Sequence, residues 1–254
     1  MIKKAMALLG AMVALVGLSG CLEMESTISV KKDGSGTLTE KATFGAQMAA
    51  MMKMGAGQEG GEDPFADFSE EKLKEKAAQY GEGVEFVSVS KEDKDGGIVI
   101  TSIYKFSDIN KVTYNPNGMM DDEEVVPDEE LKMFSFKDGE LTVTFPNPAE
   151  EDFSFGDDEM GEEEMMMAAP MMAGLKITSK LEFEGGIETT NATYRDGNTV
   201  TLMSMNFDEL MKNEGGLKVM SNLKKGSRED FAKAVKEIKG FEMESQEKVK
   251  VKLK

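Results

Sequence analysis

The stretch MESTISVKKDGSGTLTEKATF at residues 24–44 decides the fold of this chain. Residues 24–30 alternate in character and are rich in β-branched side chains, which is typical of a half-buried strand. Residues 32–36, KDGSG, combine the residue types that favour a tight turn. Extended character resumes from Thr37 to Phe44, so the sequence predicts an antiparallel hairpin.

Similar extended segments follow along most of the chain. Two further pairs flank glycine-containing turns and predict hairpins: 84–90 with 97–106, and 131–136 with 140–145. Later extended segments are 175–183, 187–194 and 198–205, the last two joined through residues 195–198. In residues 248–254, lysine alternates with Val249, Val251 and Leu253. That alternation predicts a half-buried strand with a lysine face that protects the edge of a sheet.

Helical patterns separate these strands at three places. Residues 46–54 are rich in Ala and Met, which have good helix propensity. Asp67 and Glu70 predict a capping box for a helix over 69–80. Ser227 and Asp230 predict another for a helix through Lys239, with Phe231, Val235 and Ile238 on one face. Shorter helical turns are expected at 108–112 and 207–212.

Together these patterns predict an α+β fold of mostly antiparallel hairpins with about three helices. We expect a single domain over residues 21–254, with flexible insertions near 55–67 and 146–172. The second insertion is a long acidic, Met-rich loop with no consistent period. A loop of that length inside a compact domain is either functional or disordered.

The residues that precede the first hairpin have the pattern of a secretory leader. Lys3 and Lys4 precede an apolar segment, residues 5–17, which is too short to span a bilayer. The leader ends in Leu-Ser-Gly-Cys at 18–21, which resembles the lipobox of bacterial lipoproteins. The resemblance implies a signal peptide over residues 1–20, cleavage between Gly20 and Cys21, and a diacylglycerol group on the Cys21 sulfur.

A diacylglycerol-cysteine would anchor the protein to a membrane. Each buried methylene contributes about 0.8 kcal/mol, so two or more acyl chains give durable attachment. No later stretch approaches 18 consecutive apolar residues, the length typical of a membrane span. We therefore expect a cell-envelope location. In a Gram-negative host, Leu22 after the cysteine favours the outer membrane, facing the periplasm or the cell surface.

Composition argues against nucleic-acid binding and against catalysis. The net charge of −18 repels nucleic acid, which requires basic clusters for binding. The chain contains no histidine, and its single cysteine, Cys21, is assigned to the anchor. It has no nucleophile elbow, phosphate-binding loop or zinc-protease helix. The sequence therefore predicts a non-enzymatic protein without a cofactor.

The 22 methionines allow two interpretations. Thioethers are soft ligands that suit Cu(I), so Cu(I) binding is one alternative function. Its candidate ligands are Met165, Met166, Met167, Met171 and Met172. The other interpretation is that methionine supplies flexible apolar surface, in cores or for adaptable contacts with acyl chains or a partner. A structural or protein-interaction module is a third class.

Several motifs after Cys21 resemble the mycobacterial LppM-like group of lipoproteins. They are DGSG at 33–36, FSDINK at 106–111, LEFEGGI at 181–187, Asn191-Ala192 and DGNTV at 196–200. The resemblance covers roughly residues 21–208. It implies a surface-tethered α+β domain of a type suggested to bind lipid or glycolipid, with no catalytic residues to carry over. A lipid ligand or an envelope protein is therefore the expected partner.

Overall fold

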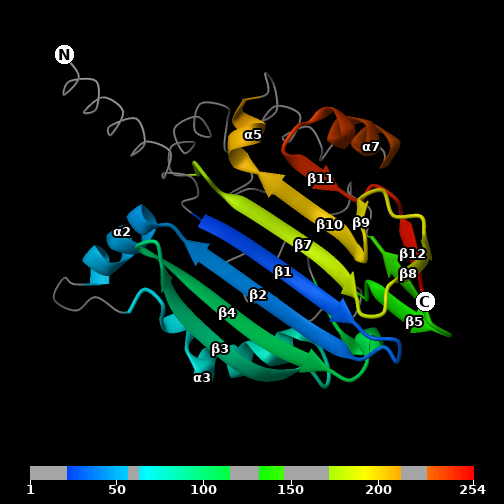
Figure 1. Cartoon of the computed structure of the whole chain (residues 1–254), viewed down its shortest axis with the longest axis horizontal. Helices are drawn as coiled ribbons and strands as arrows, with labels where there is room; N and C mark the ends of the chain where they lie inside the picture. Colours follow the sequence, from blue (N-terminus) through cyan, green and yellow to red (C-terminus); the bar gives the residue numbers. More distant parts are fainter. Residues whose placement is uncertain (1–21, 57–62, 115–131, 146–171, 213–227) are drawn as a thin grey trace, which may run out of the picture.

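The computed structural model describes residues 22–56, 63–114, 132–145, 172–212 and 228–254. Within these ranges the chain forms two β-sheets and several helices (Figure 1). The α+β class and the largely antiparallel pairing predicted above are confirmed. The predicted signal peptide and Cys21 lie outside the described residues, as does most of the acidic Met-rich loop.

The large sheet contains eight strands, in the order β11-β10-β7-β1-β2-β4-β3, with β9 paired to β10. The strands are β1 Leu22–Val30, β2 Gly36–Phe44, β3 Glu85–Lys94, β4 Gly97–Phe106, β7 Lys176–Phe183, β9 Arg195–Asp196, β10 Thr199–Asn206 and β11 Phe241–Met243. Strands β1 and β2 form the predicted hairpin, with Leu22 opposite Phe44 and Val30 opposite Gly36. The pairing of β1 with β7 is parallel.

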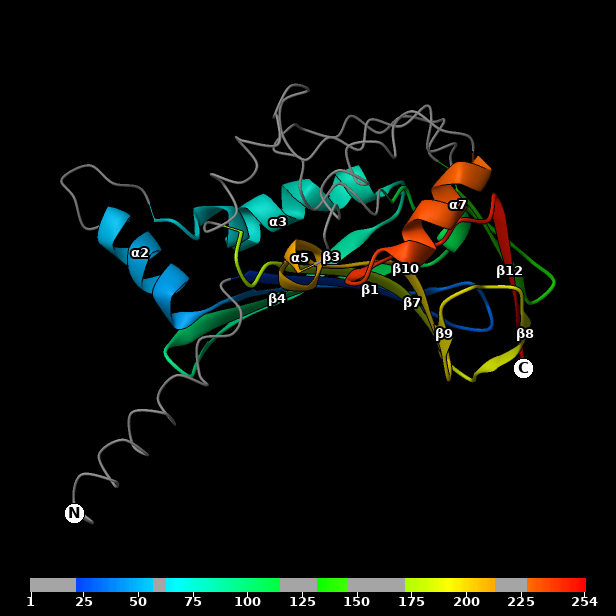
Figure 2. The same ribbon diagram turned by 90° about the horizontal axis from the view of Figure 1, so that it is seen from above.

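A smaller sheet has the order β5-β6-β12-β8 and lies at one end of the large sheet (Figure 2). Its strands are β5 Phe134–Lys137, β6 Glu140–Thr144, β8 Ile187–Thr190 and β12 Lys248–Leu253. The predicted edge position of β12 is wrong, because β12 pairs with β6 on one side and β8 on the other. Its lysines mark the solvent-facing side of the strand, while Val249 and Val251 are buried.

Helices lie over one face of the large sheet in Figure 2, and the opposite face carries no helix among the described residues. The α-helices are α2 Ala46–Ala56, α3 Glu70–Ala77, α5 Phe207–Met211 and α7 Arg228–Glu237, with 3-10 turns at Ala66–Phe68, Ala78–Tyr80 and Ile109–Lys111. We call the helix-covered side the inner face. Helix α2 stands at the end of the large sheet opposite the small sheet.

Two details of the helices differ from the prediction. Ser69, not Asp67, is the N-cap of α3, and its hydroxyl accepts a hydrogen bond from the Lys72 backbone N–H at 3.4 Å. Asp67 lies one turn earlier, inside the 3-10 turn that precedes the helix. Residues 63–67 of the predicted insertion near 55–67 include Phe65, which is buried against the Phe44 ring at 5.4 Å.

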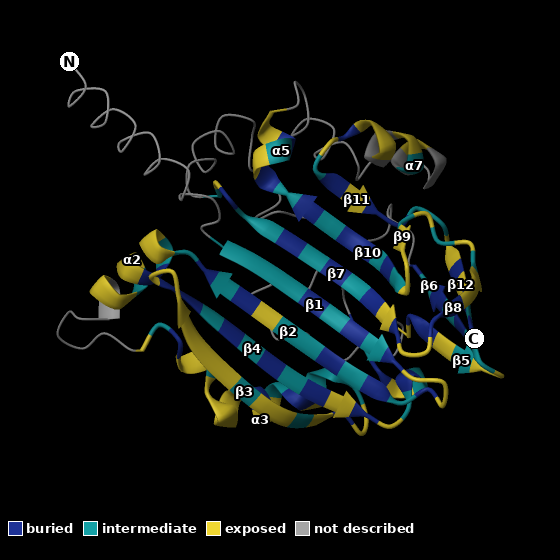
Figure 3. Ribbon diagram, viewed as in Figure 1, coloured by how far each residue is buried: buried dark blue, intermediate teal, exposed yellow. Residues whose placement is uncertain are grey.

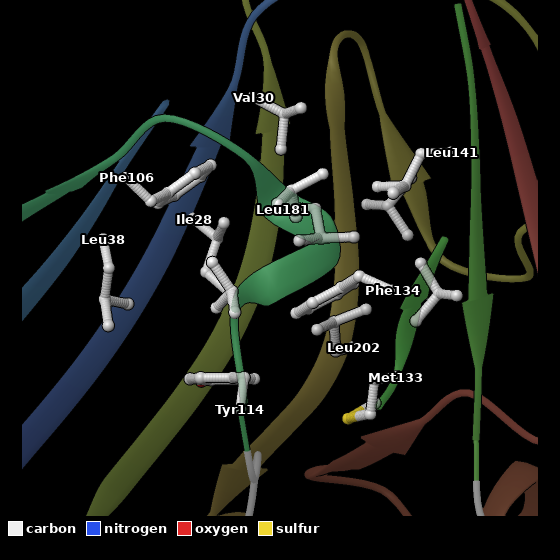
Figure 4. Packing of buried hydrophobic residues seen from close by; sticks show 14 of the residues in the cluster. Ile28, Val30, Leu38, Phe106, Tyr114, Met133, Phe134, Leu141, Leu181 and Leu202 are labelled. Carbon is white, nitrogen blue, oxygen red and sulfur yellow. The ribbon is translucent and has the colours of Figure 1, made fainter. Parts of the chain in front are cut away.

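Buried and partly exposed residues alternate along the strands, as Figure 3 shows, and the buried set forms the core. The main cluster joins the two sheets (Figure 4). It includes Ile28, Leu38 and Leu181 from the large sheet with Phe134 and Leu141 from the small one. A second cluster lies at the α2 end of the large sheet and includes Phe44, Ala49, Phe65, Ile98 and Ile100.

The remaining segments refine the predicted hairpins. The β3–β4 and β5–β6 pairs form as expected and turn at Asp95-Gly96 and Asp138-Gly139. All four of these turn residues have positive φ, as a two-residue type I′ hairpin requires. Segments 187–194 and 198–205 do not pair along their length. Instead, β8 joins the small sheet, and only the two-residue β9 pairs with β10.

Candidate ligand site on the inner face

A line of polar side chains crosses the inner face of the large sheet at one register. Ser102 of β4 lies opposite Glu40 of β2, and Glu40 lies opposite Ser26 of β1. Ser26 in turn pairs with Ser179 of β7. The three serines are buried. We call these four residues the Glu40 row.

Glu40 is the charged member of the row, and its carboxylate is held by two neighbours. The Tyr80 hydroxyl donates to Oε1, and Lys76 Nζ donates to both oxygens, at 3.1 and 3.3 Å. The Glu40 side chain is 18% exposed and that of Lys76 is 43% exposed. The row therefore reaches solvent beside Lys76.

Two buried hydroxyls lie near Glu40, and of these the Tyr104 hydroxyl has no hydrogen-bond partner among the described residues, whereas Ser26 Oγ lies near the Tyr114 hydroxyl. Among the residues that the structure describes, neither the Tyr104 hydroxyl nor Ser26 Oγ makes a hydrogen bond of normal geometry to a protein group. Tyr104 is fully buried, with its ring against those of Tyr80 at 4.9 Å and Phe86 at 5.9 Å. Leaving a buried hydroxyl unsatisfied costs about 1–3 kcal/mol. Such groups mark a place where a ligand or a water molecule can supply the missing bond.

A third tyrosine, Tyr114, lies at the Ser26–Ser179 end of the row. Its hydroxyl is 2.8 Å from Ser179 Oγ. Burial raises the pKa of Tyr114 to about 12, and the nearby Ser179 and Ser26 hydroxyls partly oppose that rise. Burial followed by the charge of Glu40 also raises the pKa of both Tyr80 and Tyr104. All three phenols therefore keep their protons at neutral pH and can donate hydrogen bonds.

The Glu40 row separates the two apolar clusters of the core. On β2, Leu38 belongs to the main cluster and Ala42 to the α2-end cluster, with Glu40 between them. On β4, Tyr104 and Ile100 flank Ser102 in the same way. The row is therefore a narrow polar band between two sets of buried apolar side chains. Hydrogen-bonding groups next to apolar side chains match the two chemical parts of an amphiphile, a polar head and apolar chains.

The outer face of the large sheet is less suited to ligand recognition. Its threonines, serines and charged side chains alternate with the buried inner residues. Several of its charges are already paired across strands, as in Lys176–Glu23 at 2.7 Å and Lys180–Glu25 at 2.9 Å. We found no unsatisfied buried group on this face among the described residues.

The site residues that the sequence predicts are not brought together in the described parts of the chain. Gly20, Cys21, Met165, Met166, Met167 and Met171 lie outside the described residues. Met172 is described and is partly exposed. No cluster of three or more His, Cys, Asp or Glu residues that could hold a metal occurs in the described ranges. In those same ranges, no helix has the length and apolar character needed to cross a bilayer.

Comparison with known proteins leaves the family of this chain open. No protein-family model matches, and no curated protein matches. Among solved structures, the chain is similar to the folded domain of the Mycobacterium tuberculosis LppM protein, determined by NMR. That match has 10% sequence identity, covers 74% of this chain and 84% of the LppM domain, and has a TM-score of 0.29. Because the TM-score is so low, we draw no conclusion from it.

Proposed function

We propose that this chain is a lipid-anchored protein of the cell envelope that binds an amphiphile, a lipid or glycolipid, at the Glu40 row and catalyses no reaction. The observation that carries the proposal is the Tyr104 hydroxyl, which is fully buried and has no partner among the described residues. It lies at the border between the apolar clusters, where the head of an amphiphile would meet its chains.

The anchor half of the proposal rests on the sequence at residues 18–21. Leu22, the first described residue, begins the central strand β1. Consecutive Cα atoms are about 3.8 Å apart, so an acylated Cys21 would hold the α2 end of the large sheet close to the membrane. A lipid ligand would then be available from the same bilayer.

Photocrosslinking of the acylated full chain tests whether an amphiphile binds at the Glu40 row. The probe is a fatty acid that carries a diazirine in its chain, added to the protein in detergent micelles. We expect adducts on peptides from β1, β2 and β4 that contain Ser26, Glu40 or Ser102. Tyr104→Phe should lower their yield about tenfold, because one hydrogen bond of about 1.4 kcal/mol is lost.

Tyr194→Phe is the matched control, since Tyr194 is a partly buried tyrosine outside the row. Its adduct yield should equal that of the wild type. Adducts that are absent, or that keep the same yield in Tyr104→Phe, would exclude the Glu40 row as the ligand site and favour a protein-interaction module.

A further inference from the structure

Helix α2 differs from the other described α-helices in having no acidic residue. Its sequence, AQMAAMMKMGA, contains Gln47 and Lys53 as its only polar side chains. In contrast, α3, α5 and α7 each contain at least two acidic residues. In a chain of net charge −18, α2 is therefore an unusually apolar segment without negative charge.

The apolar character of α2 extends beyond the side that faces the core. Met48, Ala49 and Met52 are spaced as one helical face and pack in the α2-end cluster. Met51 and Met54 lie elsewhere on the helix and are 64% and 76% exposed. They are two of the most exposed large apolar side chains in the described part of the chain. Figure 3 shows much of α2 in yellow, the colour of exposed residues. A helix that is apolar on nearly all sides is normally buried. The exposed apolar side of α2 is therefore a candidate binding surface.

The position of α2 indicates what that partner is. Leu22 packs in the same cluster as Met48 and Met52, so the first residue of β1 lies beside the helix. Figures 1 and 2 both place the start of β1 and α2 at the same end of the large sheet. Cys21 is one residue before Leu22, so a membrane anchor at Cys21 would bring α2 to the bilayer surface.

The charge of the helix is also suited to a bilayer. Acidic side chains are repelled by anionic head groups, and α2 carries none. Its Lys53 lies 3.9 Å from Asp93, and both side chains are largely exposed, so this ion pair is weak. Lys53 can therefore turn toward a lipid phosphate, while methionine adapts to the irregular surface beneath it.

We propose that the exposed side of α2, with Met51 and Met54 at its centre, docks on the bilayer that holds the Cys21 anchor. This inference rests on the anchor half of the proposed function. Docking would fix the orientation of the domain, because a flexible acyl tether alone leaves it free to rotate. The α2 end of the core would then face the membrane, with the Glu40 row behind it.

Depth-dependent fluorescence of the acylated full chain tests the docking. Met51→Cys is labelled with an environment-sensitive dye and reconstituted into vesicles of equal parts phosphatidylcholine and phosphatidylglycerol. Nitroxide-bearing lipid should quench the Met51→Cys label several-fold more than a label on Lys137→Cys. Lys137 is exposed at the end of β5, next to the β5–β6 turn, and β5 lies at the opposite end of the molecule from α2 (Figure 1).

A second pair of variants tests the role of the methionines themselves. With the label on Gln47→Cys, changing Met51 and Met54 to glutamine should abolish quenching. Flotation of the vesicles separates the two proposals. Protein that does not float overturns the anchor, whereas floating protein with an unquenched α2 label overturns docking alone. A blue-shifted label without nitroxide quenching would also overturn docking, because it places α2 against another protein.

Discussion

Removing one hydroxyl from each of two tyrosines in edge-to-face contact should change stability in opposite directions. The rings of Tyr80 and Tyr104 lie 4.9 Å apart, and a phenylalanine at either position keeps the ring. Tyr80→Phe removes a donor to the Glu40 carboxylate. A hydrogen bond to a charged group is worth about 1.5–3 kcal/mol, so the free energy of unfolding should fall by about that amount.

Tyr104→Phe should raise the free energy of unfolding. Its hydroxyl is fully buried and has no protein partner in the described ranges, so the substitution removes a desolvation penalty of about 1–3 kcal/mol. For a protein of this size, 1 kcal/mol shifts the melting temperature by about 2–4 °C. The two variants should therefore melt on opposite sides of the wild type.

Urea unfolding of the acylated chain in detergent, followed by circular dichroism, measures both values. If the slope of the unfolding free energy against urea concentration is the same in all variants, the differences reflect stability and not a change in the compactness of the unfolded state. A Tyr104→Phe variant that is less stable than the wild type would refute the reasoning, because it would show that water satisfies the hydroxyl in solution. A variant that gains stability but loses ligand would show that the hydroxyl is kept for binding.

Three further predictions follow from the structure and the sequence. All four tyrosines of the chain have raised pKa values, mainly from burial, so absorbance at 295 nm should show little ionisation near pH 10 in the folded protein. The folded state keeps phenolic protons that the unfolded chain releases, so the free energy of unfolding should fall as the pH rises above 10. Tyr114, with a pKa of about 12, alone contributes a loss of about 2 kcal/mol by pH 12. Gly36→Ala should lower the free energy of unfolding by about 3 kcal/mol, because the added Cβ would lie 1.9 Å from the Ser29 carbonyl oxygen. Gly139→Ala meets open space and has only the strain of a φ of +73°, so in the same denaturation assay it should lower that free energy by about 1–2 kcal/mol. Cys21→Ser should abolish acylation, which intact-mass spectrometry and vesicle flotation would measure. A variant that is still processed and still membrane-bound would contradict the lipobox interpretation.

Local chemistry explains which parts of the fold could be predicted from the sequence. Asp95-Gly96 and Asp138-Gly139 are strong turn signals between strands that are adjacent in the chain, so their hairpins need no tertiary information. The parallel pairing of β1 with β7 joins residues about 150 positions apart, and no local pattern indicates it. For the same reason, β12 was expected at an edge although it lies inside the small sheet.

The Glu40 row was missed because each member is unremarkable within its own strand. Ser26, Ser102 and Ser179 occupy inward positions that a period-two pattern assigns to apolar residues, but single serines are common exceptions. Only the register between strands places them beside Glu40. A search for polar residues at inward positions would have marked these four as candidates without showing that they are neighbours.

The two proposals are linked through strand β1. Ser26 of the Glu40 row is five residues from Cys21, which is about 17 Å along an extended strand. The α2-end cluster of apolar residues lies between the two points. If α2 docks on the bilayer, this apolar cluster lies between the membrane and the buried hydroxyls. Moving the anchor away by inserting a long Gly-Ser linker after Cys21 should therefore weaken crosslinking to bilayer lipids at the row, while the free fatty acid probe in micelles still binds.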